Sequence, residues 1–250
     1  MKFYMFSFEH YLFIASPFLV LILMLLLTKK TSTEKNREIG IFLSIFAIIV
    51  LLLRNLEIFV TNGFAFNIEL LPLQICHFAN FVLLIAFLKK DQIWFNFALI
   101  LNLPAAFVSI LFANSLSHYE TILTFRGFAY IVGHMLLVTL PLWAYFRGFI
   151  KLDFYYLRKT FLIVFILFLL SILINNGLYL ISNQYANYFY SLKPESGTPL
   201  ELFFDWGQEW VLFGFFKFNG LYLLLTAILG AVVMSVMYLL LFKFQQKNVA

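Results

Sequence analysis

The sequence is poor in charge and in cysteine. Asp, Glu, Lys and Arg make up 12% of its 250 residues, about half the share of an ordinary soluble domain. Cys76 is the only cysteine, so no disulfide forms within the chain. The sequence also lacks a repeat of fixed period and a low-complexity tract. Although the formal net charge is +5, the basic residues are scattered between apolar runs, which argues against nucleic acid as a partner.

Long apolar runs take the place of the missing charge, since hydrophobic residues make up 63% of the chain. Runs of roughly 20 residues are the length that crosses ~30 Å of hydrocarbon. The first run has no basic flank before it and no small-residue cleavage site after it, so it is a span rather than a signal peptide. The sequence predicts an all-α polytopic membrane protein whose single domain, 1–250, is a bundle of seven transmembrane helices, at about 11–27, 39–60, 70–88, 93–112, 127–146, 160–181 and 219–242.

The distribution of Lys and Arg predicts the orientation. One side carries Lys29, Lys30, Lys35, Arg37, Lys89, Lys90, Arg147, Lys151, Arg158, Lys159, Lys243 and Lys247. The other side carries Lys2, Arg126 and Lys193. By the positive-inside rule the N-terminus is outside, the C-terminus is cytoplasmic, and the chain is a multi-pass protein of the cell membrane. Residues 182–218 are then extracytoplasmic, and the aromatic stretch 203–210 is predicted to form an interfacial helix.

The start of the third run is unusually polar for a membrane span. Gln74, Cys76, His77 and Asn80 fall within seven residues. On a helix advancing about 100° per residue from Cys76, Asn80 falls at about 40°, His77 at about 100° and Gln74 at about 160°. Polar groups within a membrane are costly, so this arc is expected to face the interior of the bundle.

Other runs place polar side chains at a matching depth. At about 1.5 Å per residue, Cys76 lies ~9 Å and His134 ~10 Å below the outer boundary. By the same measure Arg54 lies ~9 Å deep, Asn175 and Asn176 ~8 to 9 Å and Glu57 ~5 Å, while Asn102 is nearer the midplane. The inner halves of these runs are nearly all Leu, Ile, Phe and Val. The pattern predicts a polar chamber that opens outward, or sideways into the outer leaflet.

A cysteine and a histidine at one depth are a candidate nucleophile and base, since an imidazole can take the thiol proton and the thiolate can attack an acyl carbonyl. Cys76 and His134 therefore form the candidate catalytic pair. A lone buried cysteine also serves as a small packing residue, and His134 also fits a structural role. His77 points about 100° away from Cys76 on the helix and is assigned a supporting role.

The remaining polar residues have both functional and structural interpretations. Arg54 and Glu57 are three residues apart and can form a structural ion pair, or Arg54 can bind a lipid phosphate or an oxyanion while Glu57 orients it. Asn80 and Asn102 can donate to an oxyanion or tie helices together. The other predicted substrate-binding or oxyanion residues are Gln74, His77, Tyr130 and Asn176. No metal or cofactor is expected, because His77 and His134 lack a second ligand at i+3 or i+4.

The chain resembles a known family in several segments. These are Leu71–Cys76 (LPLQIC), the pair Gly133–His134, whose histidine lies 58 positions after Cys76, the pair Asn187–Tyr188, and Pro194. It is similar to the YwaF-like bacterial integral membrane proteins and to the eukaryotic transmembrane Cys/His acyltransferase that remodels ether phospholipids. More distantly it resembles the androgen-induced fatty-ester hydrolases, which use a Thr and a His. Bacterial relatives commonly have a His where this chain has Gln74. The resemblance implies that Cys76 is the nucleophile and His134 the base.

Together these features predict a membrane acyltransferase with a thioester intermediate on Cys76. Membrane phospholipids are the expected acyl donors, and a lysolipid or a surface lipoprotein is the expected acceptor. Hydrolysis of a lipid ester is the same chemistry with water as the acceptor. The alternative from a different class is a transporter or lipid-binding protein whose chamber holds a solute without reacting.

Overall fold

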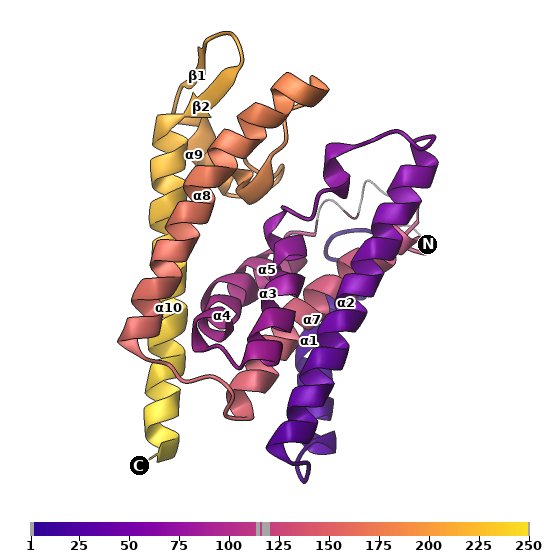
Figure 1. The fold of residues 1–250 in the computed structure, drawn as a ribbon, viewed down its shortest axis with the longest axis vertical. Helices are drawn as coiled ribbons and strands as arrows, with labels where there is room; N and C mark the ends of the chain where they lie inside the picture. The colour runs from indigo at the N-terminus through magenta and orange to yellow at the C-terminus, as the bar shows by residue number, and fades with distance from the viewer. Residues whose placement is uncertain (1–2, 114–115, 117–120, 250) are drawn as a thin grey trace.

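The computed structural model describes residues 3–113, 116 and 121–249, and the regular secondary structure of this part is helical apart from one short hairpin (Figure 1). Within it, six helical segments are long and apolar enough to cross a membrane. They are α1 (Phe8–Leu27), α2 (Thr33–Thr61), the continuous segment α4–η2–α5 (Gln92–Leu111), α7 (Phe125–Phe146), α8 (Phe154–Ser182) and α10 (Gly220–Val249). The chain is therefore a multi-pass α-helical membrane protein.

The third expected span begins later than the sequence predicted. A single 3₁₀ turn, η1 (Ile68–Leu70), precedes it, and helix α3 covers only Ile75–Lys89. The reason is Pro72, which has no N–H to donate and disfavours the helical conformation of the residue before it. At 15 residues and 1.5 Å per residue, α3 is about 22 Å long. It does not by itself match the length of a full span, so the seventh crossing stays a prediction.

The fourth span contains a widened turn. Helix α4 (Gln92–Phe97) passes into a π-helical turn, η2 (Ala98–Asn102), and then into α5 (Leu103–Leu111). Pro104 follows this turn and cannot donate the bond that an α-helix would require of it, which accounts for the local change of pitch. Asn102 lies in the π turn and is buried, only 2% exposed.

Helices α2, α3 and α7 pack against one another and form the part of the bundle that holds the site. Gly40 allows α2 to approach α3 closely, since a Cβ there would lie 2.5 Å from the ring of Phe87. Arg37 fixes the other end of α3 by donating from Nε to the carbonyl of Phe87 at 2.8 Å and from Nη2 to that of Leu88 at 2.9 Å. These carbonyls belong to the last turn of α3, where no intrahelical partner exists.

The stretch predicted as an interfacial helix, 203–210, is only partly helical. After the 3₁₀ turn η3 (Tyr188–Tyr190), helix α9 covers Leu200–Asp205 and the chain then forms an antiparallel hairpin of β1 (Glu209–Leu212) and β2 (Phe216–Asn219). Phe213 and Gly214 at its turn have φ of 54° and 77°, as a tight hairpin turn requires. Figure 1 shows the hairpin above the upper end of α10, and α8 contacts α10 below it.

Candidate active site

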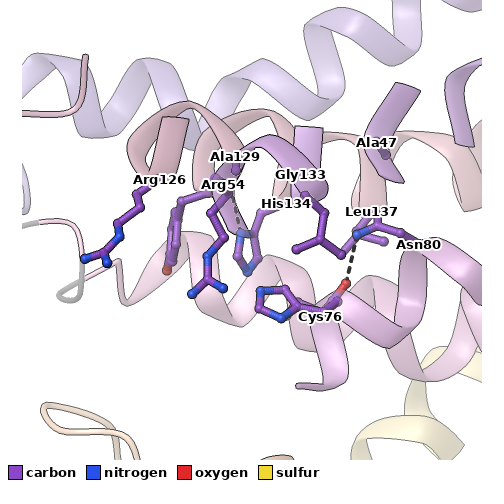
Figure 2. Close-up of a pocket in the computed structure, with 12 residues that line it drawn as sticks. Ala47, Arg54, Cys76, Asn80, Arg126, Ala129, Gly133, His134 and Leu137 are labelled. Atoms are coloured by element: carbon purple, nitrogen blue, oxygen red, sulfur yellow. Dashed lines mark hydrogen bonds between the residues drawn. The ribbon is translucent and has the colours of Figure 1, made fainter. Parts of the chain in front are cut away.

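A cavity of about 70 Å³ lies between α2, α3 and α7, on the face where these helices meet. Figure 2 shows its lining residues, among them Cys76 from α3 and His134 from α7. Each helix contributes residues three or four positions apart, which lie on one face. The three faces meet at the cavity, so residues distant in sequence line it together. The lining residues are Ala47, Leu51, Arg54, Cys76, His77, Asn80, Arg126, Ala129, Tyr130, Gly133, His134 and Leu137.

Cys76 stands in the first turn of α3, because the late start of this helix leaves Gln74 as its N-cap. The Gln74 side chain makes no capping hydrogen bond, and the first amide to bond back to the Gln74 carbonyl is that of Phe78, at 2.9 Å. The backbone N–H groups of Cys76 and His77 therefore belong to the set that has no intrahelical partner. The half-buried thiol lies at the positive end of the helix dipole, where an anion is stabilised.

The orientation of His134 is set by a backbone hydrogen bond. Its Nδ1 lies 2.7 Å from the carbonyl oxygen of Tyr130. A carbonyl oxygen can only accept, so Nδ1 carries the proton and Nε2 of the neutral ring keeps its lone pair. The Tyr130 ring packs against the imidazole with centroids 4.3 Å apart. His134 is thus held as a proton acceptor through Nε2.

Ser109 of α5 links the cysteine to this histidine indirectly. Its hydroxyl donates to the Ala105 carbonyl at 3.1 Å and lies near the Cys76 thiol, while its carbonyl accepts a 2.8 Å hydrogen bond from the Tyr130 hydroxyl. Tyr130 in turn holds His134. Sequence reasoning missed Ser109, since a serine on an otherwise apolar helix carries no motif.

His77, a member of the polar arc of α3, lines the same cavity as His134. Its ring interacts electrostatically with both Arg54 and His134. The Nδ1 atom is shielded from solvent and has no hydrogen-bond partner among the described residues. His77 is therefore a second imidazole at the cavity, adjacent in sequence to the thiol.

Two arginines line the cavity as well. Arg54 of α2 donates from Nη1 to Asn55 at 2.9 Å, and Asn55 donates to the carbonyl of Leu70 at 2.9 Å. Arg126, in the first turn of α7, donates its backbone N–H to the Glu57 carboxylate at 2.7 Å. Glu57 is not among the lining residues, and its contact with the start of α7 gives it a helix-anchoring role.

The loop after α8 also reaches the site. Both Tyr190 and Glu195 lie close enough to the Cys76 sulfur to interact with it electrostatically. Burial raises the pKa of the Tyr190 hydroxyl well above its ordinary value, so this hydroxyl stays protonated. Neither residue was predicted, because their approach depends on the fold of a long loop.

Asn175 holds this loop in place. Its Oδ1 accepts from the Tyr188 N–H at 2.8 Å, and its Nδ2 donates to the Tyr188 carbonyl at 3.0 Å and to Ser191 Oγ at 2.8 Å. Phe189 and Tyr190 both have positive φ, 56° and 50°, a conformation that costs free energy for residues other than glycine. The hydrogen bonds of Asn175 stabilise the loop on both sides of this strained pair.

The other predicted asparagines lie in different places. Asn80 lines the cavity and donates to the carbonyl of Cys76 at 3.2 Å. Asn176 is not among the lining residues; it pairs with Lys217, accepting from its N–H at 2.6 Å and donating to its carbonyl at 3.0 Å. Asn102 is also outside the lining, and both polar atoms of its buried amide lack a partner among the described residues. Gln74 stays at the N-cap of α3.

His10, at the start of the chain, has a structural environment. Its Nδ1 accepts from the Phe6 N–H at 2.9 Å, so its Nε2 donates to the carbonyl of Ile110 at 2.9 Å. Among the residues that the structure describes, no three side chains of His, Cys, Asp or Glu converge as a metal site would require.

The comparisons with known proteins give one match. The sequence profile of the TMEM164 family matches residues 5–238, nearly the whole chain. No curated protein matches the chain, and no solved structure does.

Proposed function

The chain belongs to the TMEM164 family, and from this premise we propose that it is a membrane-embedded acyltransferase related to the YwaF-like proteins and the ether-phospholipid acyltransferase. Cys76 accepts an acyl chain from a phospholipid and passes it to a lipid or lipoprotein acceptor. The observation that supports this most is that Cys76 and His134, 58 residues apart in sequence, line one cavity while Tyr130 holds the Nδ1 proton of His134.

The first half of the reaction transfers the acyl group to the enzyme. His134 Nε2 takes the thiol proton, directly or through one water, and the sulfur attacks the ester carbonyl carbon of the donor. The N–H groups at the start of α3 and the Asn80 amide are the candidate donors to the resulting oxyanion. When the carbon–oxygen bond breaks, His134 returns the proton to the departing alkoxide, so that a lysophospholipid leaves and a thioester remains on Cys76.

The second half reverses these roles. A hydroxyl or amine of the acceptor attacks the thioester carbonyl while His134 removes its proton. The carbon–sulfur bond then breaks, and the proton passes to the cysteine thiolate, which restores the free enzyme. Water as the acceptor yields a free fatty acid by the same steps, so transfer and hydrolysis differ only in which nucleophile enters the cavity.

The thioester provides the direct test. Hydroxylamine cleaves thioesters at neutral pH and largely spares oxygen esters. We expect protein purified from its native membrane to carry a substoichiometric acyl mass on the peptide containing Cys76, and hydroxylamine to remove it. Mass spectrometry of that peptide before and after treatment is the measurement. A Cys76→Ala variant that keeps full acyl transfer would instead favour a lipid-binding or transport role.

The two histidines give a matched comparison. His134→Ala is expected to abolish thioester formation, because it removes the base whose tautomer Tyr130 sets. His77→Ala is expected to leave a measurable part of it, because no hydrogen-bond partner among the described residues fixes the orientation of His77 Nδ1. Equal and total loss in both variants, at normal expression and folding, would mean that the base is misassigned.

A further inference from the structure

The cavity is basic at the end away from the cysteine. Two arginines, Arg54 and Arg126, line this end, and the described lining residues include no acidic side chain. Figure 2 shows the side chains following one another along the pocket from Arg126 through Arg54 to Cys76. A cluster of this kind is costly within a membrane unless a group of opposite charge occupies it.

Arg126 carries the strongest sign of a missing partner. Its Nε atom is shielded from solvent and has no hydrogen-bond partner among the described residues. The Glu57 carboxylate of α2, which contacts the start of α7, accepts from the Arg126 backbone N–H rather than from this Nε. A buried charged donor left without an acceptor is unfavourable, so the side chain is arranged for an acceptor that arrives from elsewhere.

We propose that Arg126, together with Arg54, binds the phosphate group of the phospholipid substrate and so selects phosphate-bearing acyl donors. This inference rests on the proposed acyltransferase function. Guanidinium groups bind phosphate oxygens through paired, charge-assisted hydrogen bonds, which suits a planar fork better than an ammonium group. Glycerophospholipids carry the phosphate only a few covalent bonds from the ester carbonyl, which matches the order of basic residues and thiol along the pocket.

The size of the cavity fits this assignment. Its volume of about 70 Å³ holds on the order of five water molecules at 10–15 Å³ each. This partly open space is on the scale of small polar groups such as a phosphate and an ester, so the acyl chains stay outside it, in the bilayer. The polar part of the lipid alone enters, and its phosphate is the feature that Arg126 is placed to recognise.

Two acyl donors separate phosphate recognition from chemistry. Full-length protein in nanodiscs is given either dioleoylphosphatidylcholine or dioleoylglycerol, which lacks the phosphate, and thioester formation on Cys76 is followed for each. Arg126→Gln is expected to raise the KM for phosphatidylcholine about tenfold to hundredfold, with kcat and the diacylglycerol reaction nearly unchanged. Arg126→Lys keeps the positive charge but lacks the planar guanidinium group, so its KM for phosphatidylcholine is expected to lie between those of wild type and Arg126→Gln. Arg158→Gln, an exposed arginine stacked on Phe154 at the start of α8, is the matched control and is expected to behave as wild type.

Native mass spectrometry supplies a readout that needs no reaction. Wild-type protein is expected to retain phosphatidylcholine, and Arg126→Gln is expected to lose it. If this difference is seen but no thioester forms, the proposed reaction fails while phosphate recognition stands. If Arg126→Gln lowers thioester formation equally with both donors, Arg126 has a structural role and the proposal is overturned. Unchanged kinetics together with unchanged lipid retention would overturn it as well. Binding of inorganic phosphate with the same dependence on Arg126, without retention of phospholipid, would overturn the lipid as the source of the phosphate.

Discussion

Asn175 offers the most direct test of how the loop over the site is held. The side chain is fully buried and makes three hydrogen bonds to Tyr188 and Ser191. Asn175→Ala leaves the Tyr188 N–H without its acceptor, whereas the Tyr188 carbonyl keeps a 3.3 Å contact from Ser191 Oγ. An orphaned buried donor costs about 1–3 kcal/mol, and with the lost bond to Ser191 the total is about 2–4 kcal/mol.

This cost is expected to appear as local opening rather than global unfolding, because the loop lies outside the long helices. At 1.4 kcal/mol per factor of ten, 2–4 kcal/mol corresponds to roughly thirtyfold to a thousandfold faster amide exchange in this loop. Hydrogen exchange with mass spectrometry on protein in nanodiscs measures it, comparing peptides from 184–199 with peptides from the start of α8. Gln184→Ala, which alters an exposed side chain of the same loop, is the control.

Since the loop carries Tyr190 and Glu195 to Cys76, the same variant is expected to lower kcat for acyl transfer about tenfold while the long helices stay protected. A uniform rise in exchange over all peptides would show that Asn175 stabilises the whole bundle instead. Unchanged exchange in the loop would refute the assignment of Asn175 as its anchor.

Two further predictions concern the cavity and the topology. A Cβ at Gly133 would meet nothing within 4 Å. Gly133→Leu is therefore expected to fill the cavity and abolish acyl transfer without changing the melting temperature, while Gly133→Ala keeps most of the activity. A fully active Gly133→Leu variant would place the reaction elsewhere. A reporter fused after Ala250 is expected to be cytoplasmic and a tag within 194–198 to be accessible from outside in intact cells, and a protected tag would reverse the orientation.

The sequence predicted the long helices well because their apolar runs report a local property. The expected span 127–146 corresponds to α7 at Phe125–Phe146, and the last span begins one residue from its expected start. Helix α2 extends further than expected, from Thr33, because Ser32 caps it outside the apolar run, accepting from the Lys35 N–H at 3.3 Å. Hydropathy locates the membrane portion of a helix, whereas capping residues decide where the helix ends.

The candidate site was predictable in part. Depth along each run placed Cys76 and His134 at one level, and the structure brings both to one cavity. The contributions of Tyr190 and Glu195 depend on hydrogen bonds between segments far apart in the chain, such as that from the Tyr188 hydroxyl to the Ile68 carbonyl at 2.7 Å. Periodicity carries no information about such contacts. The same holds for Asn176, whose partner is the backbone of Lys217 in the hairpin.

The shortness of α3 connects the fold to the proposed chemistry. With Lys89 and Lys90 at one membrane boundary, a helix of about 22 Å ends ~8 Å short of the other side of a ~30 Å hydrocarbon layer. The non-helical backbone of 71–74 then lies at membrane depth, where it is tolerated only if protein buries it or it lines a cavity. Here it precedes the cavity that holds Cys76. A helix that started at residue 70, as its hydropathy suggested, would bury the Cys76 N–H in a regular hydrogen bond and remove the thiol from the helix terminus. Pro72 disfavours a helical conformation at Leu71, which favours the later start of α3 and leaves the N–H groups of its first turn, beside the cavity, without intrahelical partners.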